Sequence, residues 1–223
     1  MSGSRVVVKL GGSAAIGAAE RVAGLAVAHD VCVVHGAGKR ISDEMERTGV
    51  EVRFVGGRRV TTDQGIRIVR AVFAAVRREV CRELGPRALP LCGDEIGLLA
   101  VRLPKLGLVG EPLPSAPPAI VAAFERGRIP VVSPLAVGPL NVNADEAAAA
   151  LAIGLGAARI VFVSDVPGVY LGGQVVPELE AREATRLLDE GALVDGIVPK
   201  LRAAVTAARS GVRAEIGETA VLA

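Results

Sequence analysis

Near its start, the chain twice repeats one pattern: a short aliphatic run, a glycine-rich turn and then a helical periodicity. Residues 5–10 contain three consecutive valines and precede Gly11 and Gly12, and residues 31–34 precede the turn 35–38. A run that is apolar at consecutive positions is typical of a strand buried on both faces, as in parallel sheets. Two such units predict a doubly wound α/β fold, whose ligands bind at the carboxyl ends of the strands.

The rest of the chain continues the alternation of strands and helices. Residues 50–60 are interrupted by Gly56 and Gly57 and predict a hairpin or lid, and residues 106–118 are predicted to be irregular. The lobe boundary is placed near residues 133–140, giving lobes of 1–135 and 136–223. Helices are predicted over 16–28, 40–47, 62–84, 120–126, 181–190 and 199–210, and strands over 89–92, 96–103, 129–133, 159–164 and, as a final pair, within 212–222.

Composition excludes several functional classes. The 223 residues include four Phe, one Tyr and no Trp, so the aromatic platforms of single-stranded nucleic-acid binders are scarce. The net charge of +2 is dispersed along the chain, which argues against nucleic-acid and membrane partners. Three cysteines without a CxxC pair predict neither a disulfide framework nor a metal site, and we expect a cytoplasmic protein with reduced thiols.

The stretch 141–145 places Asn141, Asn143 and Asp145 directly before an alanine-rich helical run. Asn143, followed three residues later by Glu146, is typical of a helix N-cap with a capping-box partner. A carboxylate in the first helical turn could also hold lysine ammonium groups. The simpler interpretation is that Asn143 and Asp145 only cap the helix.

Two lysines stand in unusual settings. Lys9 ends an otherwise apolar strand, so its ammonium group must either reach solvent or meet an anion. Lys200 follows Pro199 at a predicted helix start, where a cation is disfavoured unless an anion binds nearby. With Asp145 and the glycine turns, these lysines outline a phosphate site.

The turn 35–38 leads into a helix and suits an anion, but it is not a known nucleotide fingerprint. A Walker A loop needs glycine at Val33, and the Rossmann spacing needs glycine at Ile41. His35, which closes a buried strand, is interpreted as structural rather than catalytic. Arg58 and Arg59 follow two glycines and could form a carboxylate clamp or a solvated basic turn.

Six motifs occur in an order that resembles the amino acid kinase superfamily, most closely its N-acetylglutamate kinases. Together they span nearly the whole chain, which makes the combination far more specific than any one motif. They are VVKLGG at 7–12, HGAG at 35–38, GRRVT at 57–61, NVNAD at 141–145, VSDVPG at 163–168 and DGIVPK at 195–200.

The resemblance implies a three-layer αβα sandwich around a mainly parallel central sheet, the carbamate-kinase-like amino acid kinase fold. It implies an acylamino acid in the N-terminal lobe, ATP with Mg²⁺ in the C-terminal lobe, and transfer of phosphate to a γ-carboxylate in arginine biosynthesis. By residue, it implies catalytic Lys9, Asp145 and Lys200; phosphate-binding Gly11, Gly12, Gly36, Ala37 and Gly38; substrate-binding Arg59, Asn141 and Asn143; and nucleotide-binding Ser164 and Asp165. No metal ligand is predicted.

That reaction fits the candidate residues, which include two lysines and glycine turns but no obvious general base. A γ-carboxylate with a reference pKa of ~4.3 is already ionised at neutral pH and needs no such base. Cations and N–H groups then compensate the charge of the transferring phosphoryl group. Two alternatives stay open. One is a kinase for glutamate or α-aminoadipate attached to an acidic carrier protein, and the other is a non-catalytic sensor of nucleotide or acylamino acid.

The sequence also departs from the family pattern. Ala37 replaces the middle glycine of a triplet, which costs roughly 1 kcal/mol if that position needs a positive φ. Arg58 stands beside the expected clamp Arg59, so either could bind the substrate. The final segment is shortened, which could leave part of the adenine pocket open. The chain starts at its first core strand, and the resemblance therefore implies an arginine-insensitive homodimer.

Overall fold

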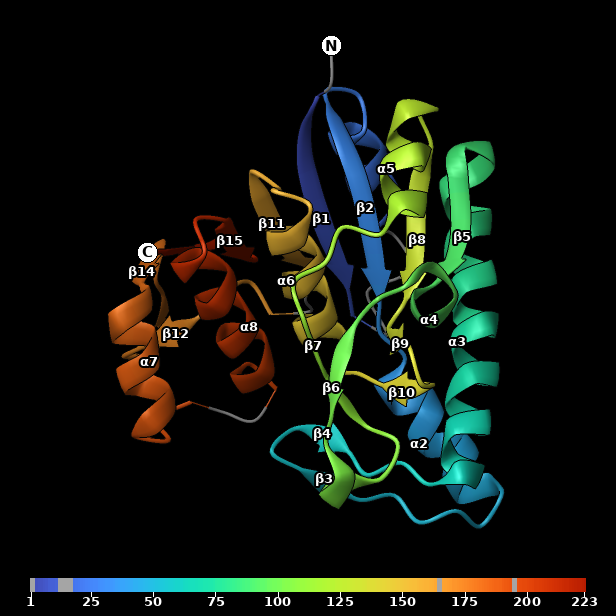
Figure 1. Ribbon diagram of the computed structural model, residues 1–223. Coiled ribbons are helices and arrows are strands. Elements are labelled where there is room, and N and C mark those ends of the chain that lie inside the picture. The colour runs from blue at the N-terminus through green and yellow to red at the C-terminus, as the bar shows by residue number, and fades with distance from the viewer. Residues whose placement is uncertain (1–2, 12–17, 164–165, 194–195) are drawn as a thin grey trace.

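The computed structural model describes residues 3–11, 18–163, 166–193 and 196–223. The fold is organised around one eight-stranded sheet (Figure 1). Neighbouring strands run parallel, except that β15 and β16 are antiparallel. The α/β class and the mainly parallel sheet are therefore confirmed. In spatial order the strands are β14 (Glu178–Glu180), β16 (Thr219–Leu222), β15 (Arg213–Ile216), β11 (Arg159–Val163), β1 (Ser4–Leu10), β2 (His29–His35), β8 (Ile129–Ser133) and β5 (Ala88–Cys92).

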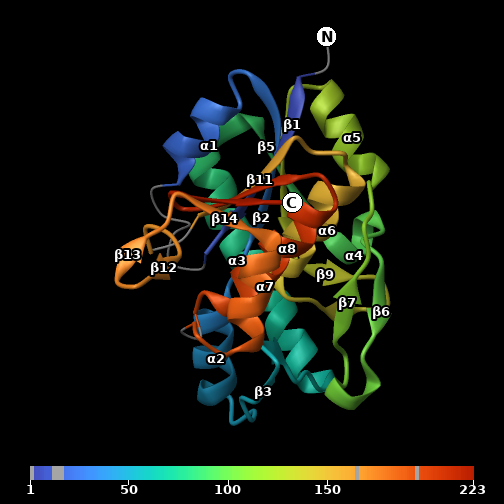
Figure 2. The same cartoon turned by 90° about the vertical axis from the view of Figure 1, so that its left-hand side faces the viewer.

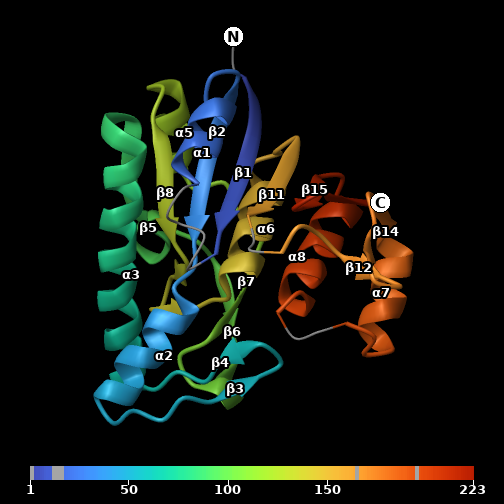
Figure 3. The same cartoon turned by 180° about the vertical axis from the view of Figure 1, so that it is seen from behind.

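Helices cover both faces of this sheet, which gives three layers (Figures 1 and 3). In the view turned by 90°, α1 and α5 lie on opposite sides of β1 (Figure 2). One face carries α5 (Pro118–Glu125), α6 (Ala144–Gly154) and α8 (Val198–Arg209), with α7 (Ala181–Asp189) packed on α8. The other carries α1 (Ala19–Leu25) and α3 (Asp63–Leu84), with α2 (Gly38–Arg47) packed on α3.

The strands feed two separate hydrophobic cores, because successive side chains of a strand point to opposite faces. In β1, Val7 belongs to the core beneath α6 and α8, whereas Val6 and Val8 belong to the core beneath α1 and α3. Lys9 lies two residues after Val7 and so points to the α6 side. The same alternation that divides the cores thus directs this lysine toward α6.

Short hairpins extend beyond the carboxyl edge of the sheet. The tip of the first one consists of Gly56 and Gly57, which have φ angles of 56° and 77°. Positive φ at both central residues is typical of a type I′ turn, whose twist matches the flanking strands. The hairpins are β3 (Phe54–Val55) with β4 (Arg58–Arg59), β6 (Ala100–Arg102) with β7 (Gly110–Pro112), β9 (Leu135–Ala136) with β10 (Leu140–Asn141), and β12 (Tyr170–Leu171) with β13 (Gln174–Val175).

Several predicted boundaries are corrected. The strand predicted over 96–103 is wrong in its first half: α4 (Gly93–Ile96) ends there, Gly97 turns the chain with a φ of 87°, and only β6 follows. The segment 106–118, predicted to be irregular, contains β7. Helix α1 begins at Ala19 within the predicted range, and α8 begins at Val198, one residue before Pro199.

The predicted final strand pair is confirmed. The final strand pair forms as β15 and β16, and Cys32, Cys81 and Cys92 are free. Among the described residues, no helix combines the length and apolarity needed to cross a bilayer. Ala37 has a φ of −153°, so alanine introduces none of the strain that a left-handed residue would have carried.

Candidate active site

Lys9, Asp145 and Lys200 meet at the carboxyl edge of the sheet, although they lie far apart in sequence. Lys9 Nζ is 2.8 Å from Oδ1 of Asp145, and Lys200 Nζ is 4.0 Å from Oδ2 of the same carboxylate. Lys9 and Asp145 are both buried, with 5% and 6% of their surface exposed. Because an unpaired buried charge is costly, this carboxylate offsets part of the positive charge of the two ammonium groups and positions both, which leaves a net charge of +1 in the cluster.

The position of Asp145 follows from how α6 begins. The Asn143 side chain accepts hydrogen bonds from the N–H groups of Asp145 and Glu146, at 2.8 and 3.2 Å, so the predicted N-cap is confirmed. The second half of the predicted capping box is different. Both carboxylate oxygens of Glu146 lie 3.1 Å from Nε of Arg58, so this side chain turns toward the hairpin.

A small pocket of about 230 Å³ opens beside this cluster. It is bordered by three sets of predicted site residues: a catalytic pair, a glycine turn and the substrate group. They are Lys9 and Asp145; Gly36, Ala37 and Gly38; and Arg59, Asn141 and Asn143.

The turn 36–38 forms one wall of the pocket and starts α2. The Gly36 N–H donates to the carbonyl of Leu10 at 2.9 Å, which ties the turn to the end of β1. Helix α2 begins at Gly38 and carries no acidic side chain in its first turn. A helix N-terminus of this kind presents N–H groups that suit an anion.

Arg59 forms another wall of the pocket and is held in place by α2. Its Nη2 donates to the Gly38 carbonyl and to Ser42 Oγ, each at 2.8 Å, and its guanidinium lies 4.5 Å from the centre of the Phe54 ring. Burial lowers the pKa of this arginine from its ordinary value. Among the described residues, no carboxylate lies within 4.0 Å of it. Arg59 is therefore a desolvated cation at the rim of a pocket that can take an anion.

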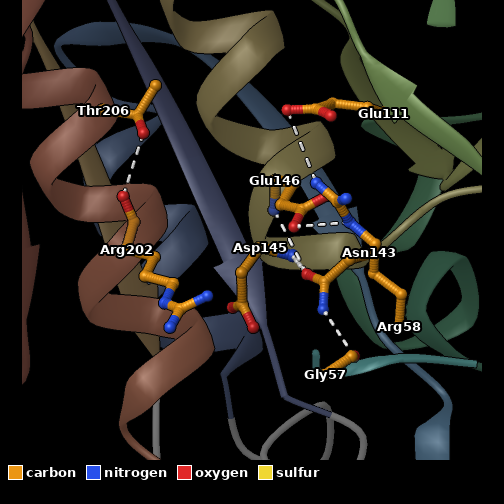
Figure 4. A network of polar contacts seen from close by, with 8 residues as sticks. All are labelled: Gly57, Arg58, Glu111, Asn143, Asp145, Glu146, Arg202 and Thr206. Atoms are coloured by element: carbon orange, nitrogen blue, oxygen red, sulfur yellow. Dashed lines mark hydrogen bonds and ion pairs between the residues drawn. The ribbon is translucent and has the colours of Figure 1, made fainter. Parts of the chain in front are cut away.

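Arg58, the next residue back, is engaged elsewhere. It donates from Nε to Glu146, and its Nη2 lies 3.5 Å from Oε1 of Glu111 on β7 (Figure 4). Desolvation of Glu146 raises the pKa of that carboxyl, and the hydrogen bond from Arg58 opposes the effect. Of the two arginines left open by the sequence, Arg59 is the one that borders the small pocket without a carboxylate partner among the described residues.

The two asparagines lie between the hairpin and α6. Buried Asn141 donates from Nδ2 to Thr61 Oγ1 at 3.1 Å, and Thr61 in turn donates to the Arg59 carbonyl at 2.8 Å. Asn143 Nδ2 donates to the Gly57 carbonyl at 3.4 Å (Figure 4). Sequence reasoning did not identify Ser42, included Thr61 only as the end of a motif and assigned Glu146 only a capping role, because each of the three acts on a neighbour of the predicted site.

His35 is fully buried, and the structural interpretation fits its surroundings. Its Nε2 lies 3.0 Å from Ser133 Oγ, and its ring meets Phe73 edge-on at 5.6 Å. Burial lowers the pKa of His35 from 6.5 to about 4. The ring is therefore neutral at physiological pH and supports the ends of β2 and β8.

Some predicted site residues cannot be placed. Gly12, Ser164 and Asp165 lie outside the described residues, and Gly11 is described at the end of β1.

A wider groove of about 850 Å³ lies on the far side of the hairpin, between α6, α7, α8 and β7. Asn143, Gly57 and Arg58 border both the small pocket and this groove.

A separate cluster brings ligand atoms of Cys92, Asp94 and Glu95 within 4.8 Å of one another. Arg70 contacts the Asp94 carboxylate and lies 3.8 Å from Cys92 Sγ. Burial also raises the pKa of the Cys92 thiol to about 11. A neighbouring guanidinium and a protonated thiol make this cluster a poor match for a cation.

Comparison with known proteins agrees with this geometry. An acetylglutamate kinase from Rubrobacter xylanophilus is 39% identical over 221 residues, covering 95% of this chain and 87% of the relative. A solved structure from Streptococcus mutans UA159 has a TM-score of 0.86 at 25% identity, covering 98% of both chains. Carbamate kinase from Giardia lamblia bound to AMP-PNP shares the fold alone, with a TM-score of 0.75 at 13% identity and 99% and 98% coverage.

The sequence profile of the amino acid kinase family matches residues 4–217. This match spans the lysine of β1, the hairpin, the start of α6 and the lysine of α8. The chain belongs to the amino acid kinase family.

Proposed function

We propose that the protein is an ATP-dependent kinase that phosphorylates the γ-carboxylate of N-acetyl-L-glutamate, giving N-acetyl-L-glutamyl 5-phosphate for arginine biosynthesis. The observation that carries this proposal is the convergence of Lys9, Asp145 and Lys200 beside a pocket rimmed by Arg59. The similarity to proteins named acetylglutamate kinase supports this substrate class.

The small pocket suits the two polar ends of such a substrate. Arg59 would clamp the α-carboxylate, and the amides of Asn141 and Asn143 would bind the acylamino group. The γ-carboxylate would then face Lys9 across a short distance. It is already ionised at neutral pH and would attack the γ-phosphorus of ATP directly while the bond to the bridging oxygen breaks and ADP leaves, so a general base is unnecessary.

Charge compensation would come from two directions. Lys9 and Lys200 would stabilise the transferring phosphoryl group, with Asp145 keeping both ammonium groups in place. The N–H groups of Gly11, Gly12, Gly36, Ala37 and Gly38 would hold phosphate oxygens.

ATP would bind in the C-terminal lobe (136–223), where Ser164 and Asp165 would contact the nucleotide, and the acyl substrate in the N-terminal lobe (1–135). Mg²⁺ would supply further charge neutralisation at the phosphates. The described carboxylates nearest the site, Asp145 and Glu146, are engaged by lysines and Arg58, so the ion is expected to arrive bound to ATP. These residues therefore fit a magnesium–nucleotide substrate better than a resident metal.

Two further expectations belong to this proposal. A homodimer is what the family resemblance implies, and the sheet is open at its two edge strands, β14 and β5. Light scattering should then give twice the chain mass of 22.8 kDa. A cytoplasmic location is supported by the three free cysteines.

The test of the reaction is hydroxylamine trapping of an acyl phosphate. Purified protein with ATP and Mg²⁺ should give hydroxamate with N-acetylglutamate but not with glutamate or carbamate. Lys9→Met should abolish the signal, whereas Lys105→Met, at an exposed lysine, should retain it. Turnover of glutamate bound to a small acidic carrier, or nucleotide binding without any turnover, would replace the proposal with one of the alternatives.

A further inference from the structure

We propose that Arg58 is a positioning residue: it latches the β3–β4 hairpin onto the first turn of α6 and thereby holds Arg59 over the substrate pocket. This inference rests on the proposed function, because the pocket in question is the one assigned to N-acetylglutamate. The two adjacent arginines would then have different roles: Arg59 binds the substrate, and Arg58 supports the hairpin that carries Arg59.

The register of the hairpin forces the two arginines apart. Phe54 pairs with Arg59 and Val55 pairs with Arg58 across the Gly56–Gly57 turn. Consecutive residues of a strand point to opposite faces, so the guanidinium groups of Arg59 and Arg58 project to different sides of the hairpin, although Arg58 also borders the small pocket. Arg59 therefore packs against α2 and Phe54, and Arg58 reaches across to α6 and β7.

The hairpin needs such a support because it is small. Each of its strands has only two residues, and an isolated two-stranded ribbon is marginally stable in water. Its base is fixed by the bond from Val60 N to Arg53 O at 2.9 Å and by the pairing of Thr61 with residues 106–108. Toward the tip, the contacts to α6 are the pair Arg58–Glu146 and the longer bond from Asn143 to Gly57.

The latch is more shielded from solvent than an ordinary surface pair. The side chains of Arg58 and Glu146 are only 22% and 27% exposed, and Nε reaches both carboxylate oxygens at 3.1 Å. Glu111, with 56% of its side chain exposed and 3.5 Å from Nη2, adds a weaker contact. Removing Arg58 would free the tip and would also leave Glu146 partly buried without its partner.

The latch also joins distant parts of the chain. Glu146 follows Asp145 directly, so the hairpin is fastened to the turn that positions both catalytic lysines. Figure 4 shows Arg58 approaching Glu146 from one side while Asp145 points away from it. The contact therefore fixes the position of Arg59 relative to the cluster of Lys9, Asp145 and Lys200.

The kinetic test compares Arg58→Met, Glu146→Gln and the double variant with the wild-type protein. Each single variant should raise KM for N-acetylglutamate about fivefold to tenfold, with kcat and KM for ATP nearly unchanged. The double variant should be no worse than either single one, because both remove the same contact. Arg58→Lys should recover part of the loss, and Glu111→Gln should change KM by less than about twofold.

A second readout does not depend on activity. Hydrogen exchange of the amides in residues 53–60 should be at least about tenfold faster in Arg58→Met than in wild type, and exchange in α3 should be unchanged. Equal exchange of the hairpin in the two proteins, or a fall in kcat at constant KM, would overturn the latch. If wild type fails to phosphorylate N-acetylglutamate, the proposed function fails, and the exchange experiment still decides the latch.

Discussion

The first turn of α6 serves two regions that differ in character. Asp145 faces a pocket of about 230 Å³ and is held between lysines, whereas Glu146 faces a groove of about 850 Å³ and is held by Arg58. Successive residues of a helix point about 100° apart, so one helix end can supply both. The small pocket concentrates buried charges suited to chemistry. The wide groove contains the contacts of Arg58 with Glu146 and Glu111, which we propose maintain the shape of the small pocket.

The largest effect should come from the small pocket. Asp145→Asn removes the carboxylate that holds Lys9 and Lys200, so their mutual repulsion is no longer offset where phosphate charge must be stabilised. We expect kcat to fall by about 10³ or more. The matched control is Asp43→Asn, at an exposed carboxylate paired with Lys39, which should keep wild-type kinetics. A fall of less than tenfold for Asp145→Asn would contradict the assigned role.

Arg59→Met should have the next largest effect. It removes the buried cation that we propose meets the α-carboxylate, and we expect KM for N-acetylglutamate to rise about 10²-fold. Arg40→Met, at an exposed arginine paired with Glu79, should leave KM unchanged. Steady-state kinetics on both variants would also sharpen the comparison with Arg58, because an equal effect at positions 58 and 59 would erase the distinction between clamp and latch.

His35 should make stability depend on pH. Burial lowers its pKa from 6.5 to about 4, so the unfolded chain takes up a proton at higher pH than the folded one. The contribution of neutral His35 to the free energy of unfolding is complete above pH 6.5 and is lost as the pH falls toward 4. At pH 5 the free energy of unfolding is lower by about 2 kcal/mol for this reason. Urea unfolding of wild type and His35→Gln should show that difference in slope. Parallel curves would mean that the ring is not held neutral.

The smallest effect is expected at the far end of the groove. Arg209 donates to Thr185 Oγ1 at 2.8 Å and is exposed. Arg209→Ala should change kcat and KM by less than about twofold and the free energy of unfolding by less than about 0.5 kcal/mol. A large kinetic defect there would show that the groove takes part in the reaction and would remove the contrast with the small pocket.

Much of this arrangement could be predicted from the sequence. Apolar runs followed by glycine turns identified the strands β1 and β2, and parallel strands bring their carboxyl ends to one edge, which explains why Lys9 meets the turn 36–38. The N-cap role of Asn143 followed from residue type and spacing alone. These features depend on local chemistry, which a sequence displays directly.

Other features depended on contacts between distant segments. The choice between Arg58 and Arg59 required the hairpin register, and the partner of Glu146 lies 88 residues away. The predicted strand 96–103 failed because the apolar residues there are divided by the turn at Gly97, and no periodicity distinguished this short run from a strand. The catalytic and binding roles of all the predicted site residues stay predictions, and Gly12, Ser164 and Asp165 also lie outside the described residues.

The two-residue tip of the β3–β4 hairpin has one more consequence. Most surface turns accept insertions and deletions freely. At this turn, one residue added within β4 ahead of Arg58 would exchange the faces of the two arginines, aiming the clamp at the groove and the latch at the pocket. We therefore expect the length of the Gly56–Gly57 segment to be constrained by function, so that natural variation here appears as substitutions rather than as gaps.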